Sequence, residues 1–129
     1  MKNILLSGLA IISCAFTCED RKECAFDHDR ACNVQNPVTE LAWLSDRIEE
    51  INQSAGSEHF YVQSAQYLTQ DVFIIENCCP DCLTLPPPVY NCEGTLLGRV
   101  GTGKDDINPS LLKNETIVWK PDNFTCNVE

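Results

Sequence analysis

The run Asp71-Val72-Phe73-Ile74-Ile75-Glu76-Asn77-Cys78-Cys79-Pro80-Asp81-Cys82 decides the fold of this chain. Its first half is rich in β-branched and aromatic residues, which favour a strand, and it ends at a proline, which cannot donate to a sheet ladder. Three cysteines lie within its last five positions. Because neighbouring side chains on a strand point to opposite faces, we expect Cys78 and Cys79 to tie the strand end to two different parts of the fold.

The composition around this strand indicates a small exported domain. The chain has 129 residues and nine cysteines, a density typical of an oxidising compartment, where disulfides supplement a small core. Lys and Arg total 9 against 19 Asp and Glu, so the net charge is −10. Without a basic surface to neutralise phosphates, nucleic acid is disfavoured as a partner, and we expect none.

The first residues have the pattern of an export signal. A lysine precedes the apolar residues 4–12, a run of signal-peptide length that is too short to span a bilayer. It leads to Ile11-Ile12-Ser13-Cys14, which resembles the bacterial lipobox, in which the cysteine carries the lipid. We therefore expect residues 1–13 to be a signal peptide, residues 14–35 a lipidated tether to a cell-envelope membrane, and residues 36–129 the domain.

The count of cysteines favours Cys14 over Cys18 as the lipidated residue. Cys18 is the alternative because an acidic pair follows it, as at the start of many mature lipoproteins. Lipidation at Cys14 leaves an even eight cysteines for disulfides, whereas lipidation at Cys18 with loss of the preceding segment leaves seven. The eight are Cys18, Cys24, Cys32, Cys78, Cys79, Cys82, Cys92 and Cys126. Their pairing stays open at this stage, although a direct bond between Cys78 and Cys79 is the least favourable.

The sequence Cys79-Pro80-Asp81-Cys82 also has the C-x-x-C spacing of thiol oxidoreductases and zinc sites. A thioredoxin-like site needs a long helix after the motif, but residues 83–88, Leu-Thr-Leu-Pro-Pro-Pro, follow instead. A zinc site needs a second close pair, and Cys78 and Cys92 are the remaining candidates. The favoured interpretation is structural disulfides with no metal and no cofactor, and thiol or metal chemistry is the alternative.

One segment has a clear helical pattern. Leu41, Leu44, Ile48 and Ile51 recur at three- and four-residue spacing with charged residues between them, which predicts an amphipathic helix that packs by one stripe on a sheet. Asn36-Pro37 or Thr39 is the expected start.

Strands dominate the rest of the chain. Residues 59–64 and 65–68 form one broken strand that pairs with residues 72–77, and residues 89–92 pair with 95–100 across the turn Glu93-Gly94. Residues 83–88 should pass outside the sheet, because prolines cannot join a central ladder. Residues 110–114 are a helical turn, residues 115–120 a last strand, and Cys126 staples the tail. The fold class is α+β: one amphipathic helix packed on an antiparallel sheet of about four strands, stapled by disulfides.

Three groups of residues are candidate sites. The aromatic residues Trp43, Tyr90 and Trp119 are candidate ligand contacts, although large rings usually belong to a core. Residues 98–104 fit the skeleton G-x-x-x-x-G-K, but Asp105 follows where a phosphate loop needs Ser or Thr, so this is a glycine-rich loop. Residues 27–29, Asp-His-Asp, read as a solvated charged loop. No catalytic residue is expected, and we predict that the protein is not an enzyme.

Several motifs together resemble a family. Leu41-Ala42-Trp43-Leu44, Val72-Phe73 before Cys78-Cys79, Tyr90-Asn91-Cys92-Glu93-Gly94 and Ile117-Val118-Trp119-Lys120 are similar to motifs of small exported cysteine-rich lipoproteins of Bacteroidota, whose function is unknown. The resemblance covers most of residues 36–126. Many relatives carry proline where this chain has Ala42. The resemblance implies export and a compact helix-plus-sheet domain, and it implies no catalytic residue.

Three functions follow from these patterns. The first is an exported, lipid-anchored, non-enzymatic binding or structural domain of the envelope, in the outer membrane, whose ligand is a protein, peptide or glycan. The second is a thiol- or metal-dependent envelope protein that uses the cluster from Cys78 to Cys82. The third is a secreted inhibitor that presents the proline-rich segment from Leu83 to Pro88.

Overall fold

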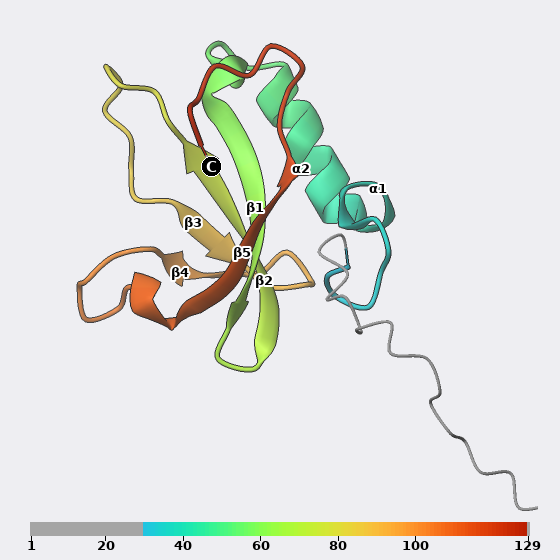
Figure 1. Cartoon of the computed structure of the whole chain (residues 1–129), viewed down its shortest axis with the longest axis vertical. Helices are drawn as coiled ribbons and strands as arrows, with labels where there is room; N and C mark the ends of the chain where they lie inside the picture. Colours follow the sequence, from blue (N-terminus) through green and yellow to red (C-terminus); the bar gives the residue numbers. More distant parts are fainter. Residues whose placement is uncertain (1–29, 129) are drawn as a thin grey trace, which may run out of the picture.

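A computed structural model describes residues 30–128. The expected signal peptide, the lipidation at Cys14, and the cysteines Cys18 and Cys24 therefore lie outside the described residues. Within residues 30–128 no helix is long and apolar enough to cross a bilayer. The chain folds into a helical layer against a curved antiparallel sheet (Figure 1), which is the predicted α+β class.

The helical segment is divided into two pieces, whereas the sequence predicted one continuous helix. Helix α1 spans Pro37–Glu40 and helix α2 spans Ala42–Asn52, with Leu41 extended between them at φ −94° and ψ 104°. The expected capping side chain of Asn36 makes no cap; its backbone amide instead donates to the Glu40 carboxylate at 2.6 Å. The break lets both pieces reach the sheet, because Val38 of α1 and Leu44 of α2 then pack on the same core.

Five strands form the sheet, one more than the sequence suggested. They are β1 (Phe60–Tyr67), β2 (Gln70–Asn77), β3 (Pro88–Tyr90), β4 (Leu96–Arg99) and β5 (Leu112–Trp119), in the order β4-β3-β2-β1-β5. The segment expected to be broken is the single strand β1, paired with β2 along its whole length from Phe60↔Asn77 to Tyr67↔Gln70. The last strand begins at Leu112 and covers the free side of β1. The helical turn predicted for residues 110–114 is the shorter 3₁₀ helix Pro109–Leu111, and residues 112–114 belong to β5 instead.

Strand β2 is buried on both faces of the sheet, which explains its continuous apolar run. On one face, the predicted helical stripe of Leu44, Ile48 and Ile51 packs against Val62, Phe73 and Ile75, and Ala31 joins this core at 5% exposure. On the other face, Val72 and Ile74 pack with Val89 of β3, with Leu112 of β5, and with Ile107 from the connection before β5. The stripe was predicted from the sequence; the second core was not.

Three disulfides staple the described residues. Cys32–Cys92 joins the segment before α1 to the end of β3, and Cys78–Cys126 joins the end of β2 to the C-terminal segment, with Cα–Cα distances of 5.6 and 5.9 Å. Cys79–Cys82 closes a local turn, with a Cα–Cα distance of 5.4 Å. Cys126 therefore staples the tail as expected. The expectation that Cys78 and Cys79 reach two distant parts of the fold was half wrong: β2 ends at Asn77, and the chain turns so sharply at Pro80 that Cys79 meets Cys82 instead.

Candidate functional site

The segment between β2 and β3 leaves the sheet and carries the two most exposed large apolar side chains among the described residues. Residues 83–88, called here the 83–88 loop, run outside the sheet until Pro88 begins β3. The side chain of Leu83 is fully exposed to solvent, and that of Leu85 is 73% exposed. Exposed apolar side chains that join into a contiguous patch mark interaction surfaces, so these two leucines are candidates where they adjoin other apolar surface.

Both ends of the 83–88 loop are fixed. At its start, the Cys79–Cys82 disulfide closes the turn, and the Cys79 amide donates to Asn77 Oδ1 at 2.8 Å. At its end, Arg99 Nη1 donates to the Pro86 carbonyl at 2.7 Å, and the Val100 amide donates to the Pro87 carbonyl at 2.9 Å. The leucines are therefore presented by a held segment whose proline run is also intrinsically stiff.

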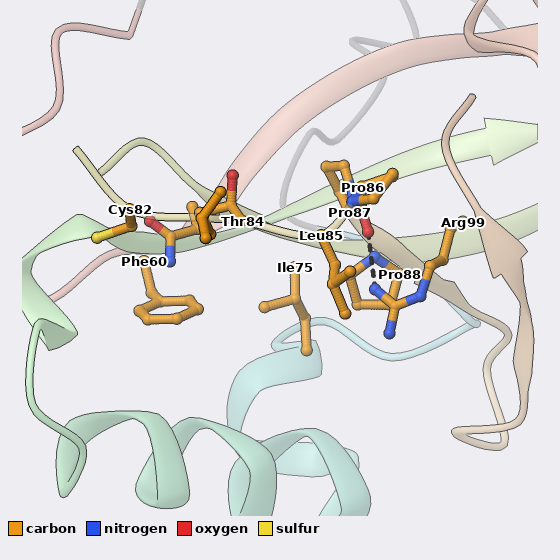
Figure 2. Close-up of a pocket in the computed structure, with 11 residues that line it drawn as sticks. Phe60, Ile75, Cys82, Thr84, Leu85, Pro86, Pro87, Pro88 and Arg99 are labelled. Carbon is orange, nitrogen blue, oxygen red and sulfur yellow. Dashed lines mark hydrogen bonds between the residues drawn. The ribbon is translucent and has the colours of Figure 1, made fainter. Parts of the chain in front are cut away.

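A groove of about 570 Å³ lies between this loop and the sheet (Figure 2). That volume is within the range of ordinary ligand sites. Figure 2 shows Phe60 and Cys82 toward one end of the groove, and Leu85, Pro88 and Arg99 gathered at the other. The residues that line it are Phe60, Ile75, Asn77, Cys82, Leu83, Thr84, Leu85, Pro86, Pro87, Pro88 and Arg99.

The groove opens where the pairing between β2 and β3 stops. The Cα partners of these two strands are Phe73↔Tyr90 and Ile74↔Val89. The same register, continued, would put Pro88 opposite Ile75 and Pro86 opposite Asn77. A proline has no amide hydrogen and cannot extend the ladder, so the end of β2 has a full partner in β1 and none of comparable length on its other side.

Sequence reasoning found the loop but missed the side chains that form the groove with it. Phe60 and Ile75 read as ordinary strand residues, and Arg99 as an exposed strand residue. One signal was available: a triple proline that precedes a strand predicts that the neighbouring strand has an unpaired end.

The three candidate aromatic residues pack on the core between α2 and the sheet. The Trp43 ring is 5.6 Å from Tyr90 and 5.8 Å from Phe73, and its Nε1 donates to the Cys92 carbonyl at 2.8 Å. Trp119 packs on this core from β5. Trp43 and Tyr90 are thus brought together and Trp119 is apart from them, while other residues line the groove.

The cysteine cluster that suggested thiol or metal chemistry is oxidised. All six cysteines of residues 30–128 are in the three disulfides. Cys32, Cys92 and Asp71 do offer ligand atoms within 4.8 Å of one another. However, a thiolate is the metal-binding form of cysteine, and these two sulfurs bind each other. The Asp71 carboxylate instead accepts a hydrogen bond of 2.8 Å from the Cys32 amide.

Within the glycine-rich loop, the Asp106 carboxylate accepts a hydrogen bond from the loop backbone. The Gly103 amide donates to Asp106 Oδ2 at 2.8 Å, and the Asp106 amide donates to the Gly103 carbonyl at 3.2 Å. A carboxylate that accepts from the loop's backbone repels a phosphate at the same place. This agrees with the sequence-based interpretation that the loop is not a nucleotide site.

One acidic group on β2 has a perturbed pKa. Glu76 is half-buried on β2, opposite Tyr61 of β1. Burial raises the pKa of the Glu76 carboxyl above its ordinary 4.5, and the negative charge of Glu115 raises it further. Burial likewise raises the pKa of the Tyr61 hydroxyl, with added contributions from Glu76 and Glu115. Neither Tyr61 nor Glu76 lines the groove.

No family model matches the chain, and no curated protein or solved structure matches it either.

Proposed function

We propose that this protein is an exported, lipid-anchored, non-enzymatic binding domain of the bacterial envelope, and that the groove beside the 83–88 loop holds a segment of a protein or peptide ligand. The observation that carries the proposal is the position of Leu83 and Leu85, which are exposed on a loop held at both ends and border a groove of about 570 Å³. Exposed leucines are costly in water, and burial against a partner recovers about 1.5–3 kcal/mol for each.

Export and anchoring are supported by the N-terminal pattern and by the oxidised cysteines. The signal-like residues 4–12 lead to Cys14, and three disulfides form in an oxidising compartment. The intact mass of protein from its native membrane fraction tests this part. We expect a diacyl or triacyl addition on Cys14, with the other cysteines alkylated after reduction and not before. An unlipidated mature chain would contradict the anchor.

Peptide display on the full chain tests the binding function. A random peptide library is panned against wild-type protein and against Leu83→Asp/Leu85→Asp. We expect enriched peptides that bind the wild type and lose at least about tenfold in affinity for the double variant. Leu68→Asp is the matched control, because Leu68 is 67% exposed in the β1–β2 turn, away from the groove. Equal loss in the control, or no enrichment on the wild type, would contradict a site at the groove.

A second candidate is an inhibitor that inserts the 83–88 loop into a peptidase cleft. The attachment of both loop ends favours it, since a pre-ordered loop loses less entropy on binding than a free one. A panel of endopeptidases tests it: an inhibitor would block one of them at stoichiometric concentration, remain uncleaved, and lose potency in Leu85→Asp. A peptide-binding domain leaves all of them active.

A further inference from the structure

At the carboxyl end of β2, the backbone groups of two residues face the groove. The Cys78 amide donates to the His59 carbonyl at 2.9 Å, so the even-numbered residues of β2 direct their amides and carbonyls toward β1. The odd-numbered residues direct theirs to the other edge, where Phe73 meets Tyr90 of β3. Ile75 and Asn77 are on that edge and line the groove. Their carbonyls face a segment whose nearest residues in register are prolines, which cannot donate to them.

An added strand would supply amide donors to these carbonyls. An extended peptide that lies in the groove antiparallel to β2 continues the direction of β3 and donates its amides to this edge. Such a peptide runs from the Asn77 end of β2 toward the Pro88 end. Its side chains on the helical side contact Phe60 and Ile75, which are apolar, and its other flank contacts Leu85.

Arg99, a cation, lies at the end of this path (Figure 2). Arg99 is the one charged residue among the described residues that line the groove, in a chain of net charge −10. It has no carboxylate partner among residues 30–128: the ion pairs there are Arg47 with Glu50 and His59 with Glu58. One hydrogen bond of its guanidinium goes to the Pro86 carbonyl, and the group has further donors for an anion.

We propose that the groove binds the C-terminal end of an extended peptide chain whose last residue is apolar. The peptide backbone pairs with the Ile75–Asn77 edge of β2, the last side chain packs against the apolar wall, and the terminal carboxylate binds Arg99. This inference rests on the proposed function, because it names the ligand class of the same groove. A free terminus also explains why the cation is at one end of the groove: an internal segment carries no backbone charge there.

The first experiment compares two forms of one probe on the full chain. Fluorescein-labelled Gly-Thr-Val-Thr-Val-Leu is prepared with a free C-terminal carboxylate and with a C-terminal amide, and its affinity is measured by fluorescence anisotropy. We expect the acid to bind about tenfold or more tightly than the amide, the size of a charge-assisted hydrogen bond. Replacing the last leucine of the probe by serine should weaken binding, because the apolar contact is lost.

Variants assign this preference to Arg99. Arg99→Gln should remove the difference between acid and amide, and Arg99→Lys should keep part of it. Lys104→Gln is the matched control, because Lys104 is an exposed cation on the glycine-rich loop, outside the groove; it should leave the difference unchanged. A thermal midpoint measured on each variant shows that the fold is intact. A purely structural role of Arg99 would change the affinity for both probes, so a change for the acid alone assigns the carboxylate contact to Arg99.

Several outcomes would overturn the inference. Equal binding of acid and amide, both lost in Leu83→Asp/Leu85→Asp, would retain the proposed function and refute the terminal carboxylate. In another outcome, decanoate displaces the probe and binds alone with the affinity of the peptide acid, in a way that depends on Arg99. That result would show a fatty-acid site and refute the peptide ligand. No binding of either probe, together with no enriched peptide from the library, would refute both the inference and the proposed function.

Discussion

The Arg99 guanidinium donates a hydrogen bond of 2.7 Å to the carbonyl oxygen of Pro86, and so connects β4 to the loop that borders the groove. This contact joins residues 13 positions apart in the sequence. It also uses a donor near the place where we propose a ligand carboxylate, so that one side chain both holds the loop and faces the groove.

Removing this contact should free the middle of the 83–88 loop. In Arg99→Ala the bond to Pro86 is lost, while the Cys79–Cys82 disulfide and the bond from the Val100 amide to the Pro87 carbonyl remain. We expect the ¹⁵N order parameter of the Leu85 amide to fall toward the flexible range, below about 0.6. Arg47→Ala is the control, because Arg47 pairs with Glu50 on the exposed side of α2. An unchanged order parameter at Leu85 would mean that the prolines alone hold the loop.

The three described disulfides should contribute unequally to stability. Cys32–Cys92 and Cys78–Cys126 span 60 and 48 positions, whereas Cys79–Cys82 spans 3. Because a cross-link restricts the unfolded chain more when it closes a longer loop, each of the first two contributes about 4 kcal/mol and the third about 2 kcal/mol. Urea denaturation of the three double Cys→Ala variants measures these losses. A loss for Cys79→Ala/Cys82→Ala as large as the other two would contradict this ranking.

Gly94 should be less replaceable than Gly56, although both have the same backbone conformation. Their φ values are +80° and +79°. A Cβ on Gly94 would lie 2.7 Å from Trp43 Cγ, while a Cβ on Gly56 has nothing closer than His59 at 4.0 Å. The Trp43 ring cannot move away freely, because its Nε1 is bonded to the Cys92 carbonyl.

We therefore expect Gly56→Ala to lose about 1 kcal/mol of unfolding free energy from backbone strain alone. Gly94→Ala should lose about 3 kcal/mol, since overpacking against Trp43 is added. Chemical denaturation of the two variants side by side gives the difference. Equal losses would show that Trp43 adjusts at little cost.

The half-buried carboxyl of Glu76 should lower the stability of the protein as the pH rises. Its folded-state pKa is raised above the ordinary 4.5, so the folded state binds more protons than the unfolded state just above that pH. The contribution of Glu76 to stability is then fully present below about pH 4.5 and is lost as the pH rises through its folded-state pKa. Glu76→Gln should therefore be more stable than the wild type at pH 7, with a gap that closes as the pH falls.

Denaturation between pH 3.5 and 7.5, with a ¹³C titration of the Glu76 carboxyl, measures this dependence. Glu115→Gln is the companion variant, because removal of that negative charge should bring the pKa of Glu76 part of the way back. A stability difference between wild type and Glu76→Gln that is constant across this range would contradict the raised pKa.

Local sequence patterns predicted most elements of this fold and part of its site. The apolar spacing of Leu44, Ile48 and Ile51 predicted the buried helical stripe, and the run before Asn77 predicted the strand. The proline run predicted that residues 83–88 leave the sheet, which holds up to Pro87, whereas Pro88 begins β3. Cys126 was expected to staple the tail, and it does. The break at Leu41 was not predicted, because it is made by packing of α1 and α2 on the sheet and not by a residue that ends helices.

The sequence by itself determined the α+β class, the helical stripe and the exposed loop, since each depends on side-chain periodicity or on proline within a few residues. Tertiary structure alone decided which cysteines pair, that Trp43 and Tyr90 meet on the core, and that Phe60, Ile75 and Arg99 join the 83–88 loop around one groove. These contacts link residues up to 60 positions apart. They depend on strand register and on the closure of long loops, which no local pattern in a single chain specifies.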